Sequence, residues 1–392
     1  MIGFNKNFNN LKKNYLFAEI SQKSDEYKQK TPEKNIIKLG IGDVTLPICS
    51  AVTDAMHNAV DEMSKKETFK GYGPYEGYEF LRKAICKYYK NFGVDINTDE
   101  IYVSDGAKSD TANIPEIFEL NGKVLIQNPT YPVYVDSSIL RGSSISYIDA
   151  NEENEFLPLP DYSIKPSLIF LCSPNNPTGA VYNKTQLKKW VDYALENKAI
   201  ILFDAAYESF IEDENLPHSI FEIEGARNCA IEICSFSKNA GFTGLRCGYV
   251  VIPNELKING EKVGSMWLRR QSIKFNGTSY ITQKGAEAAL STEGQNQIKK
   301  CISYYKENSK ILSRALKEMN IWHIGGTNSP YIWLKCPNNM SSWDFFDVML
   351  ERSSIVGTPG SGFGTNGEGF FRLSSFGEKE NILEAAIRIK KI

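Results

Sequence analysis

The sequence predicts an α/β protein with a mostly parallel central sheet, and two patterns indicate this fold class. In the middle of the chain, short apolar runs alternate with segments whose apolar residues recur at helical spacing, which is typical of a parallel sheet covered by helices. Near residue 291 the alternation stops and a long helical pattern begins. Because 392 residues exceed the usual length of one domain, we expect a large domain and a smaller second one.

The expected strands and helices follow from these patterns. Strands are predicted at residues 101–104, 123–127, 167–172, 199–204, 229–234, 247–252, 331–335 and 369–373. Helices are predicted at 52–63, 81–92, 187–195 and 291–319, with Gly93 ending the second of them. The glycine-rich run 359–367 does not open a βαβ unit, so we expect a plain loop there and no dinucleotide site.

Composition and charge argue against several classes of function. A net charge of −2 gives no basic surface for nucleic acid, and no apolar run is long enough to span a membrane. The N-terminus lacks the pattern of a secretory signal, and the eight cysteines form no CxxC pair. We therefore expect reduced thiols in a cytoplasmic protein, without a disulfide framework. The three histidines stand apart from other ligand residues, so no metal site is expected and lysine becomes a candidate for proton transfer.

The strongest local signal is a lysine just beyond an expected buried strand. It lies in the run Ser235-Phe-Ser237-Lys238-Asn-Ala-Gly-Phe-Thr-Gly-Leu-Arg246. An enzyme that uses pyridoxal phosphate (PLP) needs an amine to hold the cofactor covalently, with small polar donors and a guanidinium for its phosphate. A lone lysine in such a loop is as often a surface residue. The whole span, however, resembles the PLP-attachment signature of class I and II aminotransferases.

Three more loops lie where that family would place them, and each follows an expected strand. They are Ser104-Asp-Gly-Ala-Lys-Ser-Asp-Thr, Ser173-Pro-Asn-Asn-Pro-Thr-Gly and Phe203-Asp-Ala-Ala-Tyr. An open α/β sheet binds ligands at the carboxyl ends of its strands. By itself, an aspartate at a strand end is more often a cap or turn residue. The resemblance implies that Asp204 pairs with the pyridine nitrogen, that Asn176 and Tyr207 bond the ring oxygen, and that Ala107 and Lys108 join Ser235, Ser237 and Arg246 at the phosphate.

Within this superfamily, the sequence most resembles LL-diaminopimelate aminotransferase over most of its length. The Ala107-Lys108 pair and the triplet Phe275-Asn276-Gly277 distinguish this branch better than the shared PLP motifs do. That family exchanges an amino group between LL-diaminopimelate and 2-oxoglutarate. The resemblance implies the aspartate-aminotransferase-like fold, divided into an N-terminal arm with part of the small domain (1–47), a large PLP-binding domain (48–285) and a small C-terminal domain (286–392).

The same resemblance assigns the remaining site residues. Lys238 would move the substrate α-proton, with Asp204 and Tyr207 as further catalytic residues, and Arg372 would bind the substrate carboxylate through two hydrogen bonds. Tyr72 and Asn276 would reach the cofactor site of a neighbouring subunit, which implies a homodimer with shared sites. Tyr131 would lie on or near the pyridine ring. The residues expected to contact substrate are Tyr15, Gly42, Lys108, Tyr131, Asn176, Asn276 and Arg372.

One departure from the branch concerns the far end of the substrate. Family members typically read Gly-Tyr-Gly-x-Glu-Gln-Gly, whereas this chain reads Gly71-Tyr-Gly-Pro-Tyr75-Glu76-Gly77. Either Glu76 receives the distal ammonium after a backbone adjustment, or recognition of that end has changed. Tyr75 favours a related aminotransferase for aspartate, aromatic or other amino acids. Arg372 argues against a PLP lyase or decarboxylase, and the lack of a basic recognition helix argues against a DNA-binding regulator.

Overall fold

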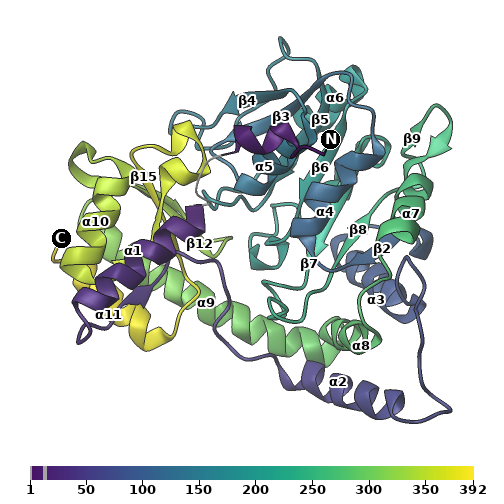
Figure 1. Cartoon of the computed structure of the whole chain (residues 1–392), viewed down its shortest axis with the longest axis horizontal. Coiled ribbons are helices and arrows are strands. Elements are labelled where there is room, and N and C mark those ends of the chain that lie inside the picture. Colours follow the sequence, from purple (N-terminus) through teal and green to yellow (C-terminus); the bar gives the residue numbers. More distant parts are fainter. Residues whose placement is uncertain (1, 12–15) are drawn as a thin grey trace.

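The computed structural model describes residues 2–11 and 16–392. Its largest element is a seven-stranded sheet in the order β2-β8-β7-β6-β5-β3-β4 (Figure 1). Strand β8 runs antiparallel to both neighbours, and the other adjacent strands are parallel. The strands are β2 (Ile101–Ser104), β3 (Lys123–Asn128), β4 (Ile145–Asp149), β5 (Pro166–Cys172), β6 (Ile200–Asp204), β7 (Ala230–Ser235) and β8 (Gly248–Val251).

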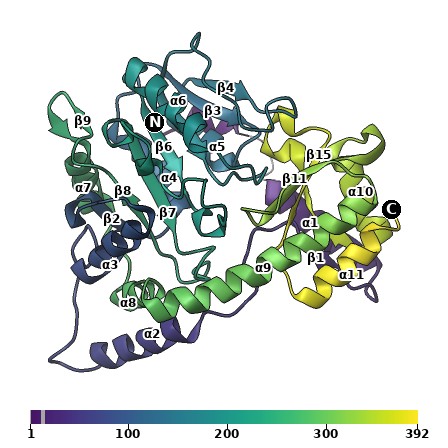
Figure 2. The same cartoon turned by 180° about the vertical axis from the view of Figure 1, so that it is seen from behind.

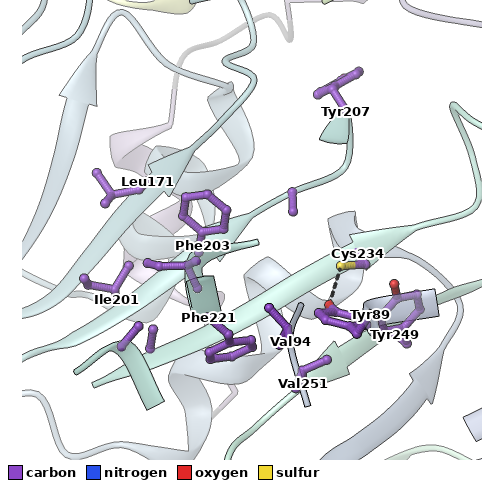
Figure 3. Packing of buried hydrophobic residues seen from close by; sticks show 14 of the residues in the cluster. Tyr89, Val94, Leu171, Ile201, Phe203, Tyr207, Phe221, Cys234, Tyr249 and Val251 are labelled. Atoms are coloured by element: carbon purple, nitrogen blue, oxygen red, sulfur yellow. Dashed lines mark hydrogen bonds between the residues drawn. The ribbon is translucent and has the colours of Figure 1, made fainter. Parts of the chain in front are cut away.

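Helices cover both faces of this sheet, because both faces of its central strands are apolar. Alternate residues of β6 contribute to two different core clusters, Ile201 and Phe203 to one and Ile200 and Leu202 to the other, as the two-residue repeat of a strand dictates. Figure 3 shows the first cluster. The covering helices are α3 (Glu79–Tyr89) and α6 (Lys184–Asn197) on one face, and α4 (Ala107–Asn113), α5 (Pro132–Arg141) and α7 (Val263–Lys274) on the other.

A second, smaller sheet of four antiparallel strands lies beside the large one, in the order β11-β12-β15-β14. Its strands are β11 (His323–Gly325), β12 (Tyr331–Lys335), β14 (Thr358–Pro359) and β15 (Phe370–Ser374). The long helix α9 (Thr292–Glu318) begins beside α8 (Tyr280–Ala289) and extends to the small sheet (Figure 2). It packs with α11 (Lys379–Ile389), while α10 (Ser342–Ser353) packs with α1 (Leu16–Lys30).

The N-terminal segment divides between the two parts of the molecule. The turn Lys6–Asn10 packs on α5, and the side chain of Asn7 donates to the carbonyl of Leu140 at 3.1 Å. Strand β1 (Ile37–Lys38) pairs with β13 (Ile355–Val356) in a separate two-stranded sheet. The N–H of Ser374, in β15, donates to the carbonyl of Leu39 at 2.8 Å, which ties this segment to the small sheet. Then α2 (Ser50–Met63) packs along α8 (Tyr280–Ala289). The predicted domain boundary at 285/286 falls inside α8 and stays a prediction.

The predicted strands and helices are confirmed, with ends that differ by a few residues. Gly93 ends the helical segment 79–92 in a left-handed conformation, with φ of 71°, which glycine adopts at little cost. The glycine-rich run forms short turns, Gly360–Phe363 and Thr365–Gly367. None of the described helices has the length and apolar character that a membrane span needs. The described residues contain no cluster of three ligand side chains suited to a metal.

Candidate active site

A cavity of about 480 Å³ lies at the carboxyl ends of β5, β6 and β7. This is the edge at which an open α/β sheet binds ligands. Its walls come from segments far apart in the sequence, so only the fold brings these side chains together. The sequence-predicted residues that line the cavity are Gly42, Ala107, Lys108, Tyr131, Asn176, Asp204, Tyr207, Ser235, Ser237, Lys238 and Arg246.

Lys238 extends into this cavity from the loop after β7. Its Nζ donates a hydrogen bond to the carbonyl of Gly42. The pKa of Lys238 is lowered to about 8, mainly by burial; Asp43 opposes this shift, and the nearby cations Arg372 and Arg246 add to it. A buried amine with a lowered pKa is partly neutral near physiological pH, which is the form that acts as nucleophile and base.

The guanidinium of Arg246 and the hydroxyls of Ser235 and Ser237 line the cavity together with Lys238. The Nη1 atom of Arg246 donates to Ser237 Oγ at 3.3 Å and to the carbonyl of Thr243 at 3.3 Å. In the part of the chain that the structure describes, Arg246 forms no ion pair with a carboxylate. A Cβ on Gly106, whose φ is 132°, would lie 2.7 Å from Arg246 Nη2. Glycine therefore lets the guanidinium approach the first turn of α4, which presents Ala107 and Lys108 to the cavity.

Asp204, the last residue of β6, is held by two hydrogen bonds. Its carboxylate accepts from the hydroxyl of Tyr134 at 2.5 Å and from the backbone N–H of Ala206 at 3.0 Å. Burial raises the pKa of Asp204, and these two bonds counteract part of that rise. A cationic group placed next to this carboxylate would stabilise its charged form.

Asn176 connects the two remaining predicted groups. Its Oδ1 accepts from Arg372 Nη1 at 2.6 Å, and its Nδ2 donates to the hydroxyl of Tyr207 at 3.5 Å. Arg372 lies in β15 of the small sheet, is fully buried, and also donates to the carbonyl of Gly40 at 2.5 Å. No carboxylate pairs with Arg372 among the described residues, and its Nε has no hydrogen-bond partner there. A buried cation without a counter-ion is suited to receive a substrate carboxylate.

Two predicted residues of the described chain, Tyr72 and Asn276, lie outside this cavity on exposed segments. Tyr72 is 91% exposed, and Asn276 is exposed on the loop between α7 and α8. These two segments adjoin each other, because a Cβ on Gly277 would lie 3.7 Å from the carbonyl oxygen of Pro74. Tyr15 lies outside the described residues. The single chain therefore presents Tyr72 and Asn276 on one exposed region, outside the cavity that holds its own lysine.

The alternative that Glu76 binds the distal ammonium meets an obstacle in the structure. The Glu76 carboxylate lies 3.6 Å from Arg82 Nη2, and the Glu76 carbonyl accepts from the Val103 N–H at 3.0 Å. Both the side chain and the backbone of Glu76 are therefore engaged within the chain. Tyr75, in contrast, is 42% exposed.

Sequence reasoning missed two tyrosines that shape the site. Tyr134 follows Tyr131 by three residues, and this helical spacing was the only signal that both side chains face the same cavity. Tyr331 begins β12, where it reads as an ordinary core residue. Its hydroxyl lies 2.8 Å from that of Tyr207, a contact between residues that are 124 positions apart.

Comparisons with known proteins identify the family. The family model described as aminotransferase class I and II matches residues 34–389. The chain belongs to the class I and II aminotransferases. It is 50% identical to proteins named LL-diaminopimelate aminotransferase from Azobacteroides pseudotrichonymphae and Agathobacter rectalis, over 100% of its own length and 99% and 100% of theirs. The solved L,L-diaminopimelate aminotransferase from Chlamydomonas reinhardtii superimposes with a TM-score of 0.93 at 43% identity, covering 100% of this chain and 98% of that one.

The sequence therefore belongs, within these aminotransferases, to the group that carries the LL-diaminopimelate aminotransferase name, as the sequence motifs predicted. The predicted aspartate-aminotransferase-like fold is confirmed as well. The family is one of PLP-dependent enzymes, and the residues of the cavity fit that cofactor chemically. A lysine with a lowered pKa, a buried carboxylate and a guanidinium with two hydroxyls match its aldehyde, its ring nitrogen and its phosphate.

Proposed function

We propose that this aminotransferase moves amino groups between LL-diaminopimelate and 2-oxoglutarate, with PLP held by Lys238. The observation that carries the proposal is that Lys238, Asp204 and Asn176 line one cavity. Arg372 donates a hydrogen bond to Asn176 at this cavity. The substrate assignment is supported by the names of full-length relatives that are half identical to this chain.

When bound, PLP supplies an aldehyde that bonds covalently to an amine and a ring that accepts electrons from the substrate carbon. Arg246, Ser235 and Ser237, with the first turn of α4, would hold its phosphate. Asp204 would hold a proton at the ring nitrogen, and Tyr134 fixes the orientation of that carboxylate. Tyr207 and Asn176 would donate to the ring oxygen.

Two residues act on the substrate itself. Arg372 would exchange its contacts to Asn176 and Gly40 for the α-carboxylate, which fixes the bond to the α-proton in a defined direction. Lys238 would take that α-proton from the substrate and later return it. Its lowered pKa of about 8 leaves part of the amine neutral for this step.

The composite site adds a second part to the proposal. We infer a homodimer in which Tyr72 and Asn276 of each chain complete the site of the other, because both are exposed and lie away from their own lysine. A substrate with an amino acid group at each end needs contacts far from the ring, and this exposed region supplies them. A cytoplasmic location agrees with eight free cysteines.

A related aminotransferase with another amino donor is the second candidate, and Tyr75 favours it. Where the branch has a glutamate, a tyrosine supplies no negative charge for a distal ammonium, and Glu76 is already paired with Arg82. The two candidates differ only in the far end of the substrate, so transamination is common to both.

A single half-reaction tests these candidates. The PLP-loaded protein is mixed in turn with LL-diaminopimelate, meso-diaminopimelate, glutamate and aspartate, and loss of the visible absorbance of the lysine-bound cofactor is followed. We expect fast loss with LL-diaminopimelate and glutamate only. The variant Y75E tests distal recognition, with E76Q as its matched control. Reaction with aspartate, but not with LL-diaminopimelate, would replace the substrate assignment by the second candidate.

A further inference from the structure

Tyr331 contacts two groups of the proposed site, although it belongs to the small sheet. It is 1% exposed and begins β12, opposite Ser374 of β15. Its hydroxyl lies 2.8 Å from the hydroxyl of Tyr207, and the two rings meet edge to face at 5.1 Å. The guanidinium carbon of Arg372 lies 4.4 Å from the centre of its ring.

The hydrogen bonds around Tyr207 constrain where protons lie. Arg372 donates to Asn176 Oδ1, so the other end of that amide, Nδ2, donates to Tyr207 Oη. A phenol has one proton and two acceptor positions. If Tyr331 fills the second acceptor position, the proton of Tyr207 is free for a further acceptor. Cooperativity along such a chain makes Tyr207 a stronger donor.

Two glycines pack closely against Tyr331. A Cβ on Gly42 would overlap the Tyr331 hydroxyl, and a Cβ on Gly179 would come within 2.5 Å of the Tyr331 carbonyl oxygen. Gly42 therefore makes room for the Tyr331 hydroxyl, and Gly179 makes room for the Tyr331 backbone. The titratable groups that face Tyr331 are Arg372, Tyr207, Cys172 and Asp204.

We propose that Tyr331 is a positioning residue of the aminotransferase reaction. It donates to Tyr207, so that the Tyr207 proton points at the ring oxygen of the cofactor. Its ring also supports the guanidinium of Arg372 in the position where the substrate carboxylate binds. This inference rests on the proposed function, since it assumes that Tyr207 donates to bound PLP.

The test is a pH titration of the visible absorbance of the PLP-loaded protein. The variants are Y331F, Y207F and the double variant. Loss of a donor leaves more negative charge on the ring oxygen, which holds the proton of the nearby lysine–cofactor nitrogen more tightly. In Y331F we expect the titration midpoint to rise by roughly 0.5 to 1 pH unit. Y207F should raise it more, and Y331F should add little in the Y207F background, because Tyr331 acts through Tyr207.

The variants Y331F and Y331L separate the role of the Tyr331 hydroxyl from that of the Tyr331 ring. Y331F keeps the ring, so KM for the oxo acid should change less than twofold, whereas Y331L should raise it at least fivefold. An unchanged midpoint in Y331F, or a shift that adds fully to that of Y207F, would overturn the proposal. If the wild-type protein mixed with PLP shows no visible absorbance of a lysine-bound cofactor, that result contradicts the proposed function and not the role of Tyr331. Thermal unfolding of each variant identifies any that do not fold.

Discussion

At the scale of single residues, the site depends on neutralising and orienting a few buried charges. Lys238 lies in a buried cavity near two arginines, so its pKa falls to about 8. Asp204 is more deeply buried, which raises its pKa, but it accepts two hydrogen bonds that favour its charged form. Burial therefore favours the neutral form of the lysine, while the hydrogen bond from Tyr134 opposes the effect of burial on the Asp204 carboxylate.

The Tyr134 hydroxyl gives a prediction at this scale. The change Y134F removes a hydrogen bond to a buried carboxylate without changing the packed volume. We expect kcat to fall by about tenfold, because a hydrogen bond to a charged group is worth roughly 1.5–3 kcal/mol and part of it is recovered. Steady-state kinetics measures this effect. The control is Y162F, since Tyr162 is exposed and lies outside the cavity, and equal rates for both variants would contradict the role.

At the scale of elements, the ends of strands position the site. Asp204 and Ser235 end β6 and β7, and Asn176 follows β5. The sequence predicted these positions because apolar runs with polar ends mark buried strands. It did not predict the bonds from Tyr134 to Asp204 or from Tyr331 to Tyr207, because those join elements that only tertiary packing brings together. Nor did it predict that Arg82 engages Glu76.

The start of α4 gives a prediction about pH and stability. Asp110 is buried beneath this turn and accepts from Ser104, which in turn accepts from the Gly106 N–H at 3.2 Å. The pKa of Asp110 is raised to about 8, against an ordinary value of 3.8. Burial is the main cause; Asp105 and Asp204 add to the rise, while the bond from Ser104 and the charge of Arg270 oppose it.

Between pH 4 and 8 the native protein therefore keeps a proton on Asp110 that the unfolded chain loses. Its contribution to stability falls as pH rises through this window. D110N keeps an acceptor for Ser104 and cannot ionise. Between pH 5 and pH 8 its free energy of unfolding should therefore fall by less than that of the wild type, and we expect the two decreases to differ by on the order of 1–3 kcal/mol. Urea unfolding at the two pH values measures this. An equal pH dependence in D110N and wild type would contradict the assignment, and D25N, at an exposed position, is the control.

At the scale of the whole molecule, the site lies where the two sheets meet. Asn176 and Tyr207 come from the large part, and Arg372 and Tyr331 come from the small sheet. Helix α9 spans both parts (Figure 2), and its Tyr305 accepts from the backbone N–H of Leu46 at 2.7 Å. From the exposure of Tyr72 we infer that the neighbouring chain contributes a third part of the site.

Mixed dimers test that contribution. Chains carrying K238A and chains carrying Y72A are each expected to be nearly inactive alone. After mixing and subunit exchange, one site of each hybrid has Lys238 from one chain and Tyr72 from the other. Random association should therefore restore about a quarter of wild-type activity. No recovery, in a mixture that exchanges subunits, would show that Tyr72 acts within its own chain.

The most direct test of the central claim is to find which lysine binds the cofactor. The PLP-loaded protein is reduced with borohydride and digested, and the modified peptide is sequenced by mass spectrometry. We predict a single pyridoxyl group on Lys238, and none in K238A treated in the same way. A modification on Lys108, which also lines the cavity, or no modification of the wild-type protein, would contradict this account of the site.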